Sequence, residues 1–160
     1  MKIALFRTCI YFSLAAAITT TFTSCVSGGS KKSGLELQAF QKKDFECEKK
    51  VAFASTISVF QDLGYIIKSA DLETGLISAS SPTKNLHFYG SYMSNTEASA
   101  FIEELVPKKS SIRLNFVKVN ESSSGYGMKS KYDSPIETAD AYENAFGKIR
   151  EAIFIRTNSR

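Results

Sequence analysis

The chain has 160 residues, 12% of them aromatic and 22% charged, and a formal net charge of +4. This length fits one ordinary domain with a hydrophobic core of its own. Basic residues occur as isolated pairs, such as Lys42-Lys43 and Lys108-Lys109, which is typical of a solvated surface. The composition therefore argues against a protein that binds nucleic acid.

Residues 1–24 have the features of a secretory signal peptide. Lys2 and Arg7 flank the start of a mostly apolar run, Cys9 to Ile18, which is shorter than the ~20 apolar residues of a membrane-spanning helix. The next residues, Phe22-Thr23-Ser24-Cys25, resemble the bacterial lipobox, with phenylalanine where leucine is usual. The resemblance implies that Cys25 carries a lipid and becomes the first residue after cleavage. The alternative is an ordinary signal peptide with a chance cysteine.

The lipobox divides the chain into three segments. Residues 1–24 form the signal peptide, residues 25–34 the lipidated cysteine and a flexible tether with a reach of roughly 15 to 18 Å, and residues 35–160 a single domain. Two or three acyl chains on Cys25 would hold this domain stably on a membrane. In enterobacterial lipoproteins an aspartate after the cysteine retains the protein at the inner membrane. By resemblance, Val26 and Ser27 favour the periplasmic face of the outer membrane.

Cysteine usage fits this organisation. Cys9 is lost with the signal and Cys25 is used by the lipid, so Cys47 remains alone and an intramolecular disulfide is excluded. Cys47 is either a reactive thiol, an intermolecular partner, or a small, partly buried apolar group.

The stretch from Phe53 to Ser81 predicts a helix, a glycine stop and a β-hairpin. Apolar residues recur at helical spacing from Phe53 to Leu63, in a helix that begins near Glu48. Gly64 then fits the left-handed position after the helix, and Tyr65 can pack back on Phe60. Two strands follow, Tyr65 to Ala70 and Leu76 to Ser81, joined by a loop in which Gly75 supplies a positive φ.

The remaining elements are read from alternation and capping signals. Leu35 to Gln41 alternates and predicts a first strand. Ser94-Asn95-Thr96-Glu97 is a capping box, which predicts a second helix that Pro107 ends. Ile112 to Asn120 predicts a long strand whose apolar face changes at Lys118, which suggests a bulge, and Tyr126 to Tyr132 predicts an edge strand.

The last element is a predicted helix with Ser134 as N-cap and Pro135 at its first position. Its apolar face includes Tyr142, Phe146 and Ile149. Together these elements predict an α+β domain in the order β-α-β-β-α-β-β-α, a helix-grip-like antiparallel sheet with two main helices packed on one face, after the N-terminal signal peptide.

Over Leu35 to Arg156 the segments VFQDLGY, TGLISAS and AYENAFGKIREAIFI are similar to a group of small, functionally uncharacterised bacterial membrane-anchored lipoproteins. The layout also resembles the helix-grip domains of the C lipoprotein of the outer-membrane β-barrel assembly machine. Neither resemblance implies catalytic residues in this chain.

An enzyme is not expected from the residues themselves. His87 is the one histidine, so every triad or metal scheme with a histidine would have to use it, and no nucleophile motif accompanies it. No metal site and no cofactor are predicted, since neither a second histidine nor a free cysteine stands at ligand spacing.

Two non-enzymatic functions remain open. The first is a protein-interaction module at the cell envelope, with a candidate surface at His87, Phe88, Tyr89 and Tyr92, since tyrosine is enriched at interfaces. The same residues could instead fill the core or an edge. The second function is lipid or small-ligand binding in a groove lined by Tyr142, Phe146 and Ile149; against it stands a filled core.

Overall fold

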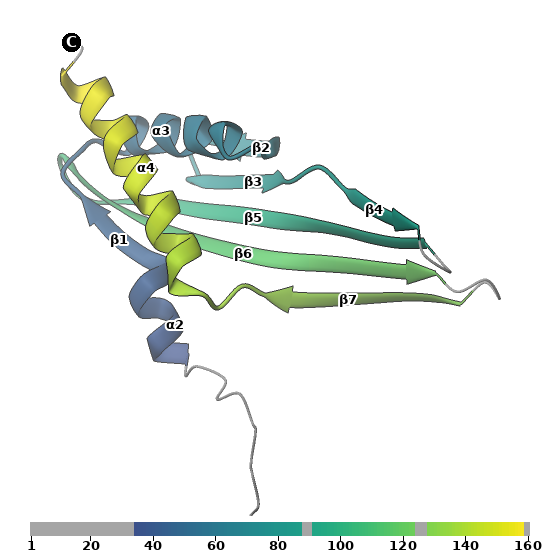
Figure 1. Cartoon of the computed structure of the whole chain (residues 1–160). Coiled ribbons are helices and arrows are strands. Elements are labelled where there is room, and N and C mark those ends of the chain that lie inside the picture. Colours follow the sequence, from purple (N-terminus) through teal and green to yellow (C-terminus); the bar gives the residue numbers. More distant parts are fainter. Residues whose placement is uncertain (1–33, 88–90, 124–127, 159–160) are drawn as a thin grey trace, which may run out of the picture. The chain divides into compact units, whose positions relative to one another are not determined.

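The computed structural model describes residues 34–87, 91–123 and 128–158. Cys25, the signal peptide and most of the predicted tether lie outside these residues. Figure 1 shows a twisted antiparallel sheet with helices against it. In chain order the elements are α2 (Gly34–Gln41), β1 (Lys42–Phe45), α3 (Lys49–Asp62), β2 (Ile66–Asp71), β3 (Leu76–Ser80), β4 (Lys84–His87), β5 (Ser91–Val106), β6 (Lys109–Ser123), β7 (Lys129–Pro135) and α4 (Ala139–Asn158).

The long strands β5 and β6 form the centre of the sheet and pair over almost their whole lengths, from Ser91↔Ser123 to Val106↔Lys109. At one end of this pair the order is β1-β6-β5-β3-β2. At the other end β4 pairs with β5, and β7 pairs with β6. All pairings are antiparallel, so the structure confirms the predicted α+β class with an antiparallel sheet.

Helices α3 and α4 cover one face of the sheet, as predicted. Register partners share a face, and the alternate residues Ala98, Ala100 and Ile102 of β5 are buried together with Ile112 and Leu114 of β6. The same core contains apolar residues of both helices, among them Phe60, Tyr142 and Phe146. We call this the helix side of the sheet.

The end of α3 confirms the predicted glycine stop. Gly64 has φ 83°, its N–H donates to the carbonyl of Gln61 at 2.9 Å, and the N–H of Tyr65 donates to the carbonyl of Phe60 at 2.8 Å. These two bonds define a Schellman motif. The Tyr65 ring lies 5.8 Å from the Phe60 ring, centroid to centroid, so the expected contact is also present.

Two predicted elements have the wrong type. Leu35 to Gln41 is not a strand but helix α2, which buries no side chain completely, although Phe40 packs against the core. It consists largely of good helix formers, and the position beside β6 is occupied by β1 instead. The predicted helix after Ser94 is strand β5, because pairing with β3, β4 and β6 uses its backbone hydrogen bonds and outweighs the local capping box.

Two boundaries also differ from the prediction. Ser134 and Pro135 end β7, and α4 begins only at Ala139. Proline is tolerated there because β7 is an edge strand. The predicted strand Ile112 to Asn120 is confirmed within β6, and its apolar face does change, since Phe116 and Val119 are buried on opposite sides. No bulge causes this change, because the β5–β6 register is continuous until Glu104.

Candidate interaction surface

The sheet continues past the helices as a four-stranded ribbon, visible on the right of Figure 1. We define the ribbon as Lys84–His87 of β4, residues 91–97 of β5, residues 117–123 of β6 and Lys129–Pro135 of β7. The predicted interface residues fall on it in part. His87 pairs with Ser91 through the backbone, and Tyr92 is 38% exposed. Phe88 and Tyr89 lie outside the described residues.

The pleat of the strands separates the ribbon's side chains into two sets. On the helix side, Tyr92, Ser94 and Thr96 stand in register with residues 122, 120 and 118 of β6. The opposite side carries Met93 and Glu97 from β5, together with their neighbours on β6 and β7. The two sides of the ribbon therefore present different side chains.

A groove of about 600 Å³ lies on the helix side of the ribbon, beyond the end of α3. Tyr92 contributes to its wall, beside residues from strands β4, β5 and β6 and from the connections after α3 and β3: Leu63, Gly64, Ser81, Pro82, Lys84, Ser94, Asn95, Thr96 and Lys118. Lys84 and Lys118 are missing from the predicted site, because only the strand register brings them to the groove. We call it the ribbon groove.

Side-chain hydrogen bonds hold the strands of the ribbon in place beside this groove. The Tyr92 hydroxyl donates to Oδ1 of Asn120 at 2.6 Å, and the Ser94 hydroxyl donates to the same oxygen at 3.0 Å. On the β3 side, the backbone N–H of Thr96 donates to Oγ of Ser81 at 2.8 Å. Because these bonds link β5 to β6 and to the connection after β3, the wall of the groove is held in one arrangement.

The residues predicted to line a ligand groove lie in the hydrophobic core instead. Tyr142, Phe146 and Ile149 are fully buried in the core between α4 and the sheet. The Tyr142 hydroxyl donates to the carbonyl of Ile136 at 2.9 Å and accepts from the N–H of Phe116 at 3.3 Å. It thus fixes the start of α4 to β6.

A second groove of about 440 Å³ opens next to this core, between the end of α3 and the start of α4. Its lining combines apolar and polar residues: Leu63, Tyr65, Phe116, Ile136, Asp140, Ala141 and Asn144. Burial raises the pKa of Tyr65, because the phenolate would lose its hydration. This groove borders the core, but none of the three residues predicted to line a ligand groove lines it.

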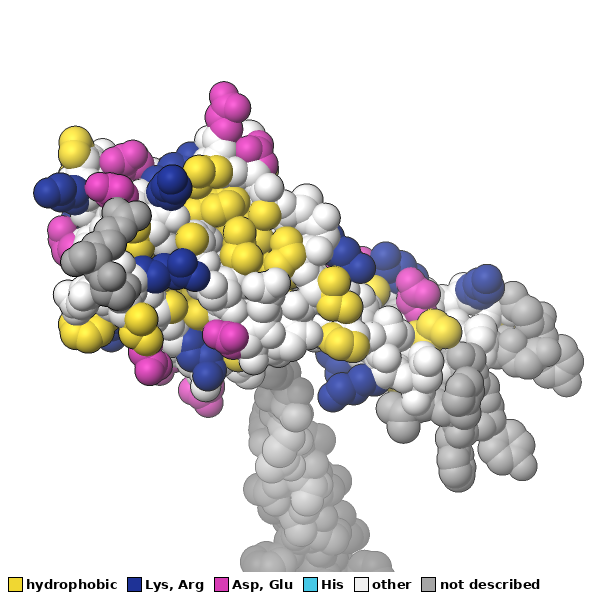
Figure 2. Space-filling view, turned by 90° about the horizontal axis from the view of Figure 1, so that it is seen from above, with side chains coloured by type: hydrophobic (Ala, Val, Ile, Leu, Met, Phe, Trp, Pro, Cys, Tyr) yellow, Lys and Arg dark blue, Asp and Glu magenta, His cyan; other side chains and the backbone are white. Residues whose placement is uncertain are grey.

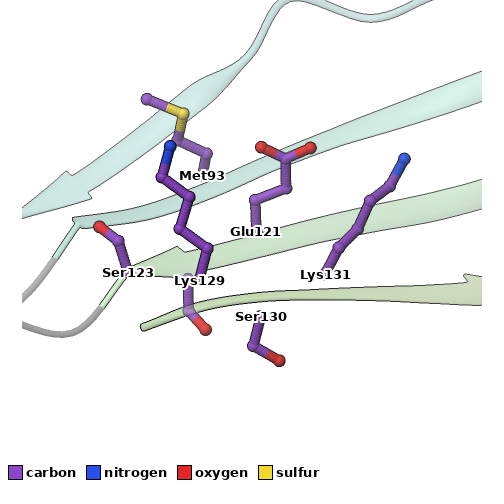
Figure 3. A pocket seen from close by; sticks show the side chains of 7 residues that line it. Met93, Glu121, Ser123, Lys129, Ser130 and Lys131 are labelled. Carbon is purple, nitrogen blue, oxygen red and sulfur yellow. The ribbon is translucent and has the colours of Figure 1, made fainter. Parts of the chain in front are cut away.

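The opposite side of the ribbon carries a smaller hollow of about 350 Å³, shown in Figure 3. Met93, Glu121, Lys129 and Lys131 stand on this side, whereas the Ser130 side chain points the other way, as alternation requires. Sequence reasoning does not find this hollow, since its residues come from three strands and share no local motif.

The helix-free side of the sheet exposes apolar residues nearer its β2 edge. Leu76 and Phe101 are register partners on β3 and β5, with exposed fractions of 54% and 39%. Figure 2 shows the molecule of Figure 1 from above. On the face seen there, hydrophobic side chains gather in a patch with charged residues around it.

Cys47 is buried, and burial raises the pKa of its thiol. Its backbone carbonyl accepts a 2.8 Å hydrogen bond from the Ser110 hydroxyl. Of the three interpretations of Cys47 that the sequence leaves open, this placement fits the small, buried apolar group.

Within residues 34–87, 91–123 and 128–158, no group of three or more histidine, cysteine or acidic residues is arranged to hold a metal ion. None of the helices described there is long and apolar enough to cross a bilayer. Neither a comparison with models of protein families nor a search of curated proteins gave a match. The resemblance to small bacterial lipoproteins therefore stays a prediction.

Proposed function

We propose that the chain is a lipid-anchored, non-enzymatic protein-interaction module of the bacterial cell envelope. In this proposal Cys25 carries the anchor, the outer membrane is favoured over the inner one, and the described domain meets its partner at the periplasmic face. The observation that supports a binding role is the ribbon groove, whose wall includes the exposed Tyr92. Tyrosine combines apolar area with a polar tip, which suits an interface.

The shape of the ribbon supports the same proposal. The four strands of the ribbon extend beyond the helices, and the groove on them has a wall ordered by hydrogen bonds. A partner can therefore reach the sheet surface without unfolding the domain. A preordered surface loses little conformational freedom when it binds, which favours affinity. The core beneath α3 and α4 is filled by buried side chains and supports the ribbon from its base.

Site-specific cross-linking in intact cells tests the proposal. A photoreactive amino acid replaces Thr96 in the ribbon groove, and a matched variant carries it at Arg150, an exposed position of α4. We expect a discrete, reproducible cross-linked protein only from position 96, identified by mass spectrometry. Equal products from both positions, or none from position 96 in correctly folded protein, would contradict a partner at the groove.

Binding of a lipid or small ligand is the second candidate, favoured by the groove beside α4. Leu63, Tyr65 and Ile136 give this groove an apolar part, and Asp140 and Asn144 give it polar groups. Ala141→Trp should fill it and displace a bound fluorescent fatty acid, with Gly147→Trp, elsewhere on α4, as the control. A fatty acid that binds wild type and both variants equally, or does not bind at all, would remove this candidate.

A further inference from the structure

The described lining of the ribbon groove contains positively charged side chains that are not balanced by carboxylates on the same side of the ribbon. Lys84 and Lys118 line the groove, and none of its described lining residues has a carboxylate. On the described part of the ribbon, the acidic residues Glu97, Glu121 and Asp133 all belong to the opposite set of side chains. On the described ribbon the helix side thus carries lysines without carboxylates, whereas the opposite side carries carboxylates together with Lys129 and Lys131.

The two lysines are not neutralised within the described part of the chain. The ion pairs there join Lys42 to Glu103 and Lys109 to Asp44, at the other end of the sheet. Because no acidic group of the described residues lies within 4 Å of either one, both ammonium groups stay available to a negatively charged molecule in the groove.

Asn120 adds a hydrogen-bond donor to the same side. Its Oδ1 already accepts bonds from Tyr92 and Ser94, which occupy the two lone pairs of that oxygen. The remaining polar group of the side chain is the amide nitrogen, which can only donate. The surface beside the groove therefore offers cations and a donor, and this combination suits an acceptor-rich anion.

We propose that the ribbon groove binds an extended, acidic peptide segment of a partner protein, a proposal that rests on the interaction function above and names its partner's chemistry. Lys84 and Lys118 stand on β4 and β6, which flank β5, and their register partners Ser94 and Thr96 are two residues apart, so the Cα atoms of the two lysines are about 12 Å apart. This spacing suits carboxylates two to four residues apart on an extended chain, which advances ~3.3 Å per residue. A single small anion would need donors that converge on one point.

A binding assay with the full, lipidated chain in detergent tests this proposal. The probe is a fluorescent peptide of alternating glutamate and threonine, and the matched peptide has glutamine in place of glutamate. We expect the acidic peptide to bind wild type at low ionic strength and the glutamine peptide to bind at least about tenfold more weakly. Added salt should weaken the acidic complex, because it screens exposed charges.

Charge-reversal variants locate the site. Lys84→Glu and Lys118→Glu should each weaken binding of the acidic peptide by about threefold to fivefold, the range of an exposed ion pair. The matched controls Lys129→Glu and Lys131→Glu change net charge equally on the opposite side and should leave binding within about twofold. Lys118→Gln provides a milder variant in case a reversal disturbs folding, which circular dichroism checks.

Three results would overturn the proposal: no binding of the acidic peptide to wild type, equal losses from reversals on the two sides, or a preference for phosphatidylglycerol vesicles over the peptide that depends on Lys118. The interaction function is judged separately. A discrete cross-link from position 96 together with any of these results would keep the interaction surface and reject its acidic partner.

Discussion

Replacing Gly75 by alanine should be the most damaging exchange of a glycine for alanine in the described domain. Gly75 precedes β3 with φ 78°, and its carbonyl accepts a 2.9 Å hydrogen bond from the N–H of Ile102. An added Cβ would overlap the Ile102 carbonyl oxygen and would lie 3.2 Å from Cε of Lys49. The oxygen is part of the backbone of a central strand, so the loop must move away from β5.

The cost combines two terms. A non-glycine residue at positive φ costs roughly 1–2 kcal/mol. Moving the loop also removes the partner of the Ile102 N–H, and a buried donor left unpaired costs about 1–3 kcal/mol. We therefore expect Gly75→Ala to lower the free energy of unfolding by roughly 2–5 kcal/mol, measured by urea denaturation followed by circular dichroism.

Two other glycines serve as controls for these terms. Gly64 also has a positive φ, 83°, but an added Cβ there would meet nothing within 4 Å, so Gly64→Ala should cost only the roughly 1–2 kcal/mol of the backbone term. Gly147 lies inside α4 with equal space around it, and Gly147→Ala should stabilise by up to about 1 kcal/mol. Equal losses at positions 75 and 64 would refute the argument from the Ile102 contact.

Three further results are expected. Tyr142→Phe removes a buried hydroxyl that joins α4 to β6 and should destabilise the domain by about 1–3 kcal/mol in thermal unfolding, whereas Tyr132→Phe, at a 67% exposed side chain, should leave the melting temperature unchanged. Thr74→Val should raise the pKa of Asp71 toward the ordinary carboxyl value in an NMR titration, because the Thr74 hydroxyl, followed by the Glu73 N–H, holds that pKa low. Since the folded pKa is lowered, the contribution of the Asp71 carboxylate is present above the ordinary pKa and is lost as the pH falls through the lowered one; an unchanged pKa in the variant would exclude the hydroxyl as the cause. Cys25→Ala should leave the chain unlipidated, and unchanged partition into the detergent phase would exclude the acyl anchor.

The part of the fold that the sequence predicts best is held by local chemistry. The end of helix α3 before Gly64 and the hairpin with Gly75 depend on backbone conformations that few residues other than glycine adopt, and the two glycines are visible in the sequence directly. The hydrogen bonds of Gly64 and Tyr65 then follow from the same few residues. Such elements need little information from distant parts of the chain.

Strand β5 shows why the middle of the domain is predicted wrongly. Its residues contain two apolar patterns at once: a helical one through Ala98, Phe101 and Ile102, and an alternating one through Ala98, Ala100 and Ile102. The structure uses the second, and leaves Phe101 39% exposed. Partners on both edges of β5 decide between the patterns, and these partners are distant in sequence.

The candidate site also combines a feature that local sequence predicts with a feature that depends on distant parts of the chain. Residue type alone places Tyr92 in the predicted interaction surface, since tyrosine is enriched at interfaces. The charge of the ribbon groove is not, because it requires knowing that Lys84 and Lys118 share a side of the sheet. Two residues of different strands acquire a common face only through register, which a single sequence does not contain.

One signal in the sequence does mark where the ribbon begins. The alternation of β6 is broken at Lys118, the next residue after Phe116 on the helix side. Phe116 is 4% exposed under the helices, whereas Lys118 is exposed. On β5 their register partners are the buried Ala98 and the half-buried Thr96. A charged residue in the apolar row is tolerated only where the cover of helices has ended, because a buried, unpaired ammonium group would lose its hydration. The break in the pattern therefore marks the edge of the helix layer, and the groove proposed as the binding site starts at that edge.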